Sequence, residues 1–450
     1  MSAAGSTSSV SWSGRGVAPT RWRTGFRQEH QQLSASVIVV FSLVVVLYLS
    51  QSARLNRVGI TAPLVFTVAG TLAAVTTFDT RVDAGVVRAL TETTLALVLF
   101  SDASRIRLAQ LRLDAALCGR LLLIGLPLTL LLGFLSARAL APEISVALAL
   151  LLASALAPTD AGLGSATVLN PAVPGRIQRL LNVESGLNDG LVTPVVVFAI
   201  AAAGQAGAEQ PDAVSAALRE LALGVGIGIA SGIAVALLLR RARRQSTIRV
   251  ALVPVAVVAT PLLAYYCAVA AHGNGFVAAF MAGLAFASVR QPHHPTGPSL
   301  PVRTDDGDLV LAEGVSAFLG YAVWTLFGVV AVAHLDALFT WQGLLFSVLS
   351  LTVLRMLPVA LALLGTGLRP VTVGFVGWFG PRGLASVVFA LIAVESLPDT
   401  AGLRVVIGAI TTTVILSVVL HGATAGPWAA RYGRWVTRTK PPVELVGSDA

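Results

Sequence analysis

One short polar stretch inside an apolar sequence decides how this chain folds: Asn182-Val183-Glu184-Ser185-Gly186-Leu187-Asn188-Asp189-Gly190. Two further polar stretches interrupt apolar runs: Ala157-Pro158-Thr159-Asp160 upstream and Gly377-Trp378-Phe379-Gly380-Pro381-Arg382-Gly383 far downstream. An ionisable side chain near the middle of a bilayer costs roughly 2.5–3.5 kcal/mol on insertion scales, so it usually serves a pathway or a binding site. We therefore interpret the three stretches as parts of one site.

The composition predicts a polytopic membrane protein. Hydrophobic residues make up 55% of the chain and charged residues only 12%, whereas soluble globular proteins are about 25% charged. Apolar segments of about 20 residues, long enough to cross a bilayer as helices, recur along the chain. These segments lack the alternation of membrane-barrel strands, so we expect an all-α fold.

Loop charges predict the orientation in the cell membrane. Arginines gather on the loops of one side and carboxylates on the other, which is the positive-inside pattern with a cytoplasmic C-terminus. The net charge of +9 therefore reflects orientation, and we expect no nucleic-acid partner.

A disordered tail is predicted for residues 1–33, a transmembrane domain for 34–427 and a short cytoplasmic tail for 428–450. An odd number of spans would place the arginine-containing N-terminal tail outside the cell, against the positive-inside pattern. Either the tail tolerates this position or the predicted number of spans is wrong by one. Thirteen spans are predicted: 36–52, 58–77, 87–102, 114–137, 143–169, 177–203, 215–239, 250–270, 274–289, 309–333, 341–365, 371–395 and 403–426.

The spans indicate an internal duplication. Spans four to six and spans eleven to thirteen occupy matching places around a central seventh span. The middle member of each triplet is interrupted, one at Pro158 and the other at Gly380-Pro381. Paired interrupted helices in matching positions are typical of inverted-repeat transporters, whose site lies near the middle of the membrane. The sequence therefore predicts transport and no enzymatic activity.

Four side chains of the central stretch form a polar stripe on the predicted helix 177–203. Glu184 and Asn188 are four residues apart, as are Ser185 and Asp189, so each pair shares a helix face and the two faces adjoin. Carboxylate, amide and hydroxyl oxygens suit a hard cation such as Na⁺. No histidine or cysteine lies nearby in the sequence, and we expect no cofactor.

The upstream stretch adds oxygens to this site. Thr159 and Asp160 follow Pro158, which removes a backbone donor and frees a carbonyl. An unwound segment there would offer main-chain oxygens to an ion.

Asp189 is the predicted exchanging group. Burial disfavours the charged form of a carboxyl group, so Asp189 can hold either a proton or a cation, but not both. That competition is the physical basis of an exchanger. Because residue 188 is asparagine instead of a second aspartate, one carboxylate trades one proton for one monovalent cation. The sequence therefore predicts electroneutral exchange.

Two arginines in predicted spans need partners, because an unpaired charge inside a bundle is very costly. We expect Glu184 to pair with Arg382 in a structural ion pair between two helices. Arg355 is a possible supporting residue, and its partner is not evident from the sequence.

The same residues resemble the first family of monovalent cation/proton antiporters, which includes the sodium/proton exchangers. The resemblance rests mainly on the run Glu184-Ser185-Gly186-Leu187-Asn188-Asp189 with its Asn-Asp pair, which is similar to the family signature. It extends to Thr159-Asp160, His272-Gly273-Asn274-Gly275-Phe276 with Met281-Ala282-Gly283, and Gly380-Pro381-Arg382-Gly383. One departure is Ala161, where many members have proline.

The resemblance implies a thirteen-helix homodimer in which a core moves against a dimerisation part. The core would comprise residues 114–203 and 341–426, the dimerisation part 36–102 and 250–333, and a linker helix 215–239. By the same resemblance, Na⁺ would bind at a set of oxygens with Glu184 and Asn188 close by. That set is Asp189, Asp160, Thr159 and Ser185.

Other readings stay open at this point. A K⁺/H⁺ antiporter of the same fold fits every observation above. An intramembrane aspartyl protease would use Asp160 and Asp189, but its Gly-x-Gly-Asp element is replaced here by Gly186-Leu187-Asn188-Asp189, and thirteen spans count against it. A channel with the same lining would need no proton-linked carboxylate.

Overall fold

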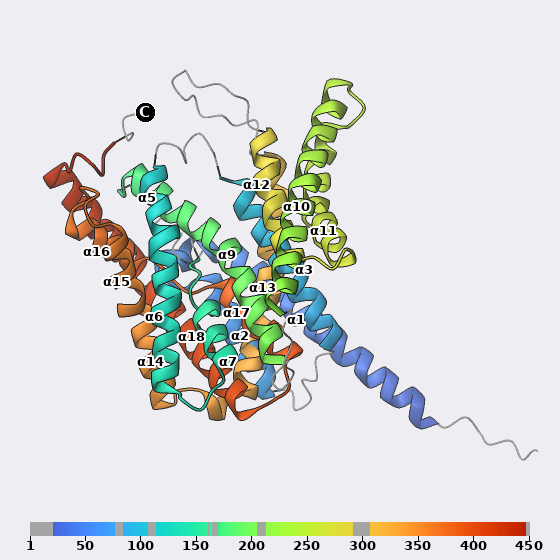
Figure 1. The fold of residues 1–450 in the computed structure, drawn as a ribbon. Coiled ribbons are helices and arrows are strands. Elements are labelled where there is room, and N and C mark those ends of the chain that lie inside the picture. Colours follow the sequence, from blue (N-terminus) through green and yellow to red (C-terminus); the bar gives the residue numbers. More distant parts are fainter. Residues whose placement is uncertain are drawn as a thin grey trace, which may run out of the picture. The chain divides into compact units, whose positions relative to one another are not determined.

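The computed structural model describes residues 21–76, 84–106, 114–160, 163, 170, 172–204, 213–290 and 307–446. Within these ranges every regular element is a helix (Figure 1), so the predicted all-α fold is confirmed. The chain divides into two compact units after Ser50. The first unit contains most of helix α1 (Arg21–Arg57), and the second contains all the other helices.

The helices of the second unit follow one another closely along the chain. A short π-helical turn over Leu121–Gly125 joins α5 to α6 into one continuous segment. The helices are α2 (Ala62–Thr76), α3 (Ala84–Ser104), α5 (Ala115–Arg120), α6 (Leu126–Leu140), α7 (Val146–Ala155), α9 (Gly175–Gly204), α10 (Ala213–Arg244), α11 (Val253–Ala270), α12 (Gly275–Arg290), α13 (Gly307–Ala333), α14 (Trp341–Leu351), α15 (Val353–Ala362), α16 (Pro370–Trp378), α17 (Leu384–Ser396) and α18 (Ala401–Thr439).

Helices overlap all thirteen predicted spans. In the part of the chain that the structure describes, 9 helical segments are long and apolar enough to cross a membrane. Shorter apolar helices accompany them: α2, α7, α12 and α17. The number of crossings therefore stays a prediction, as does the division into core, dimerisation part and linker.

Both chain ends differ from the predicted boundaries. Helix α1 begins at Arg21, inside the tail that was predicted to be disordered, because residues 21–33 are rich in the helix formers Arg, Gln and Glu. Helix α18 continues to Thr439, well into the predicted C-terminal tail. It ends where Lys440 adopts a left-handed backbone conformation with φ of 43°. Residues 441–446 then turn back, and Glu444 is fully buried.

The two interrupted helices meet at their breaks, as the sequence predicted. The chain runs unwound through residues 156–160 after α7, and through residues 379–383 between α16 and α17. We call these two segments the crossing. The backbone N–H of Asp160 donates to the carbonyl oxygen of Pro381 at 2.8 Å, so each break satisfies backbone groups that the other leaves open.

Helix α12 packs closely against the polar stretch of α9. A Cβ atom added to Gly190 would lie 2.3 Å from the ring of Phe280, so α9 and α12 approach closely only because residue 190 is glycine. Helix α10 approaches the other side of α12 in the same way, where a Cβ on Gly228 would lie 2.4 Å from the carbonyl oxygen of Ala278. Small residues at such contacts are typical of helix pairs in membranes.

Candidate functional site

The polar stripe of α9 faces the crossing. Glu184, Ser185, Asn188 and Asp189 are all buried. The Ser185 hydroxyl donates to the carbonyl oxygen of Thr159 at 2.6 Å, and the Asn188 amide donates to the Thr159 hydroxyl at 2.8 Å. The structure therefore brings the central stretch and the upstream stretch together.

Asp160 lies at the centre of the crossing. One oxygen of its carboxylate accepts from the backbone N–H of Leu384 at 3.1 Å, at the start of α17. A carboxylate is favoured at a helix N-terminus because open N–H groups point toward it. A Cβ atom on Gly383 would lie 2.2 Å from the Cβ atom of Asp160, so only glycine fits at this point.

Asp189 has an oxygen without a partner. Its Oδ1 atom is buried and forms no hydrogen bond, and the Oδ1 atom of Asn188 is in the same situation. Among the described residues, no arginine, lysine or histidine forms an ion pair with Asp189. A buried oxygen left unsatisfied costs about 1–3 kcal/mol, and more when it is charged. Asp189 is therefore a buried carboxyl group that no side chain of the described residues neutralises.

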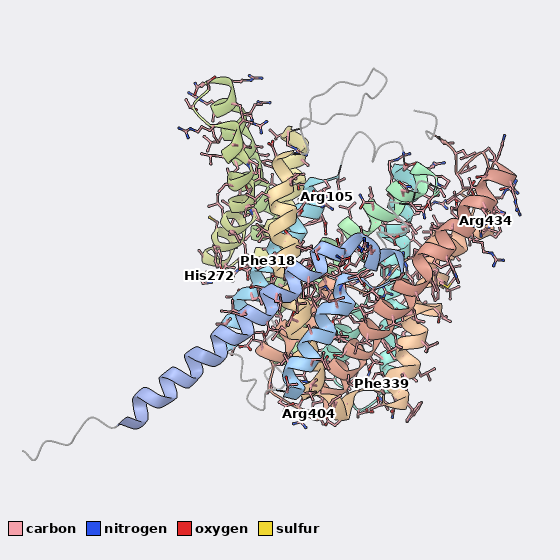
Figure 2. The ribbon with its side chains drawn as sticks, turned by 180° about the vertical axis from the view of Figure 1, so that it is seen from behind. Arg105, His272, Phe318, Phe339, Arg404 and Arg434 are labelled. Carbon is pink, nitrogen blue, oxygen red and sulfur yellow. The ribbon has the colours of Figure 1, made fainter. Side chains whose placement is uncertain are left out.

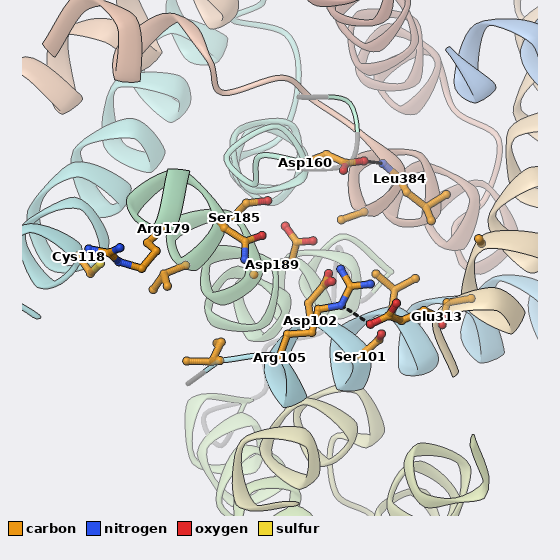
Figure 3. A pocket seen from close by; sticks show the side chains of 18 of the residues that line it. Ser101, Asp102, Arg105, Cys118, Asp160, Arg179, Ser185, Asp189, Glu313 and Leu384 are labelled. Carbon is orange, nitrogen blue, oxygen red and sulfur yellow. Dashed lines mark hydrogen bonds and ion pairs between the residues drawn. The ribbon is translucent and has the colours of Figure 1, made fainter. Parts of the chain in front are cut away.

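A cavity of about 290 Å³ is lined in part by Asp189. Figure 3 shows carboxylates of three segments lining it: Asp102 of α3, Asp160 of the crossing and Asp189 of α9. Farther out, Arg105 and Glu313 form an ion pair of 2.8 Å between Nε and Oε1, and their side chains are 44% and 36% exposed. The mouth of the cavity is thus lined by a partly exposed charge pair.

The cavity opens toward one end of the second unit. Figure 2 shows Arg105 toward the same end as Arg434 of α18, with Arg404 and Phe339 toward the opposite end. Arg179 and Asp114, at the starts of α9 and α5, also line the cavity. This is the end at which the sequence places the arginine-rich loops.

Asp102 is a candidate site residue that the sequence analysis missed. It lies at the end of an apolar run, in a position where a helix commonly leaves the membrane, and a charged residue there looks like a water-facing one. Its backbone packs against Gly186, because a Cβ on that glycine would lie 3.6 Å from the carbonyl oxygen of Asp102. The sequence signal for Asp102 was therefore indirect: Gly186, in the polar stretch of α9, leaves room for another helix to pack there.

The ion pair of Glu184 was assigned to the wrong arginine. Arg355 of α15, and not Arg382, binds Glu184 through two hydrogen bonds of 2.5 and 2.9 Å. The side chains are 6% and 4% exposed, respectively. The bidentate geometry explains how both charges are tolerated inside the bundle.

Arg382 instead binds backbone oxygens of broken helices. It is fully buried, and its guanidinium donates to the carbonyl oxygens of Ala157 at 2.8 Å, Pro158 at 3.1 Å and Ser350 at 3.2 Å. A helix C-terminus carries partial negative charge, which a cation stabilises. Arg382 therefore holds the crossing together and leaves Glu184 to Arg355.

The predicted cation ligands offer only oxygen atoms. Within the described ranges, no three His, Cys, Asp or Glu side chains come close enough to hold a metal ion together. The predicted ligands are Asp189, Asp160, Thr159 and Ser185, of which Asp160, Ser185 and Asp189 line the cavity. Such a set of hard oxygens fits a weakly held monovalent ion better than a resident transition metal.

Comparison with known proteins gives one family and one fold. The family model described as "Sodium/hydrogen exchanger, transmembrane" matches residues 39–431. The structure of the sodium proton antiporter MjNhaP1 from Methanocaldococcus jannaschii at pH 8 is similar to this chain, with a TM-score of 0.70 and 18% sequence identity over 89% of this chain and 99% of that chain. An electron-microscopy structure of the same antiporter gives a TM-score of 0.69 and 16% identity over 90% of this chain and 98% of that chain. At these identities the two structures establish likeness of fold.

Proposed function

Because the chain belongs to the sodium/hydrogen exchanger family, we propose that it exchanges one monovalent cation, Na⁺ or Li⁺, for one proton by alternating access. The family supports cation/proton antiport as the general activity. The choice of ion, the stoichiometry and the mechanism below are our proposals. A homodimer remains our prediction for the assembly.

The single observation that carries the proposal is the buried Oδ1 atom of Asp189, which has no hydrogen-bond partner, in a residue that lines the cavity. When Asp189 is ionised, a cation compensates the buried charge. When Asp189 is protonated, the negative charge that attracts the cation is absent and the cation dissociates. The two ligands therefore exclude each other. Exchange follows if the loaded site opens alternately to the two sides of the membrane.

The surrounding residues support the assignment of roles. Ser185 and Thr159 offer hydroxyl and carbonyl oxygens, and Asp160 adds a carboxylate that is already held by the start of α17. Asn188 is neutral and binds Thr159. Since Asp189 alone changes its protonation state in this scheme, one cation replaces one proton and no net charge moves.

We place the protein in the cell membrane with its C-terminus in the cytoplasm. The proposal rests on the arginine-rich loops predicted for that side, in accordance with the positive-inside pattern. The cavity beside Asp189 would then open to the cytoplasm in this conformation.

Transport by purified protein in proteoliposomes tests the proposal. With an acidic interior, Na⁺ or Li⁺ added outside should release internal protons, and Asp189→Asn should abolish the release. Asp399→Asn is the matched control, because that carboxylate is 63% exposed and lies outside the site. An Asp189→Asn variant as active as the parent would show that another group exchanges the proton.

Two further measurements separate the finer claims. Competition at Asp189 predicts that the cation KM rises as the pH falls, because protons occupy the same oxygen. Collapsing the membrane potential should leave the rate unchanged if exchange is electroneutral, and a strong dependence would refute that stoichiometry. Exchange with K⁺ but not with Na⁺ or Li⁺ would replace our assignment of the ion.

A further inference from the structure

We propose that residues 441–446, which we call the C-terminal clasp, position the crossing for ion binding, with Glu444 as the positioning residue. The inference rests on the proposed function, since it concerns the same ion site. It assigns a role in transport to a segment of the predicted short cytoplasmic tail, residues 428–450.

Glu444 binds the start of α16. Its side chain is fully buried, and one carboxylate oxygen accepts from the backbone N–H of Arg369 at 2.9 Å and from the Thr372 hydroxyl at 2.8 Å. Arg369 is the N-cap residue of α16 but provides no side-chain cap. The open N–H groups of that helix end favour a carboxylate, and here the carboxylate comes from the far end of the chain.

The contacts around Glu444 fix the segment firmly. Thr372 also shares a hydrogen bond of 3.0 Å with the Tyr432 hydroxyl of α18, and the Tyr432 ring stacks on Phe375 of α16 with centroids 4.1 Å apart. Leu445 packs against the hydrophobic cluster that contains these rings. The Oε1 atom of Glu444 accepts both hydrogen bonds, while its Oε2 atom is buried without one. The two bonds to α16 are therefore what stabilises this buried carboxylate.

The clasp also binds the start of α9. The Arg176 guanidinium donates to the carbonyl oxygen of Val443 at 2.5 Å and to the Asp114 carboxylate at 2.7 Å. Arg176 is on the first turn of the helix that carries Asp189. The clasp thus joins the first turns of α9 and α16, and these starts lie at the same end of the second unit as α5 (Figure 1).

The consequence for the ion site follows from the short length of α16. This helix leads directly from the clasp into the break at residues 379–383, where the carbonyl oxygen of Pro381 binds Asp160. A shift of the start of α16 would therefore move the crossing relative to the stripe on α9. Because Asp160 belongs to the crossing and Asp189 lies on α9, the spacing of the two carboxylates depends on the clasp.

Transport kinetics of the full chain test the proposal. Truncation after Lys440 and Glu444→Ala should each raise the cation KM about tenfold, the change expected for loss of a hydrogen bond to a charged group. Glu444→Gln keeps an accepting oxygen and should restore most of the affinity. Truncation after Val446 is the matched control, since it leaves every contact of the clasp in place. An unchanged KM after truncation at Lys440 would overturn the proposal.

A second measurement does not depend on transport. In a chain with Cys118→Ser and Cys267→Ser, the substitution Val376→Cys places a thiol at a fully buried position of α16, in the hydrophobic cluster that Leu445 contacts, and leaves the hydrogen bonds of Glu444 in place. A membrane-impermeant maleimide should label this thiol slowly in the full chain and quickly after truncation at Lys440. Equal labelling in both would show that the clasp does not cover α16, and would overturn the proposal even in a protein that folds poorly after truncation. A parent protein without cation/proton exchange would refute the proposed function, while the labelling would still report on the clasp.

Discussion

Removal of one charge of the Glu184–Arg355 pair should destabilise the protein strongly. The two side chains are 4% and 6% exposed and share two hydrogen bonds. Glu184→Gln leaves the Arg355 guanidinium buried without a counter-charge, which costs about 3–5 kcal/mol in comparable buried pairs. A chain of this length shifts its thermal midpoint by only about 1–2 °C per kcal/mol, so we expect a fall of roughly 5 °C.

The assay is thermal unfolding in detergent at one fixed scan rate, because the midpoint of an irreversible transition depends on the rate. The double variant Glu184→Gln/Arg355→Gln should recover much of the loss, since neither charge is then left alone. Asp399→Asn, in the exposed pair with Arg404, provides the control and should change the midpoint little. A shift for Glu184→Gln no larger than that of the control, or strictly additive effects in the double variant, would refute the assignment of Arg355 as the partner.

Three other substitutions test the cavity and the crossing. Asp102→Asn should raise the cation KM by about fivefold without abolishing exchange, because it removes a negative charge from the cavity wall; an unchanged KM in proteoliposomes would exclude Asp102 from the path. Arg105→Ala should lower the cation KM at low ionic strength, and the effect should fade at high salt as screening increases. Gly383→Ala should abolish exchange because its Cβ would collide with Asp160. In contrast, Gly374→Ala, on the open face of α16, should be tolerated, and equal activity of these two variants would contradict the geometry of the crossing.

The parts of the site that depend on local sequence were predictable. The spacing of four residues fixes which side chains of α9 share a face, and the structure buries all four members of the stripe. Pro158 and Gly380-Pro381 predict the breaks, because proline lacks the N–H that a continuous helix needs. The all-α fold likewise follows from the apolar segments, since a backbone in lipid must satisfy its own hydrogen bonds.

The parts that depend on the path of the chain in space were not predictable. Asp102 looks like any charged residue at a helix end, and only the packing of α3 on Gly186 directs it into the cavity. The clasp was predicted to be a tail, because a short polar segment carries no sign that it returns to α16. The choice between Arg355 and Arg382 was wrong because both have the same charge, and the sequence does not indicate which one lies beside open helix ends.

The partners of Arg355 and Arg382 have a consequence for the proposed mechanism. Arg382 is bound by three backbone carbonyl oxygens, and Arg355 is bound by Glu184, so both of these buried arginines have partners. Had either arginine paired with Asp189, it would have held that carboxylate ionised and left nothing for an ion to neutralise. In the described part of the chain, Asp189 instead forms no ion pair, and its Oδ1 atom is buried without a hydrogen bond in a residue that lines the cavity. In the proposed mechanism, these two arginine pairings leave Asp189 available to the competing proton and cation.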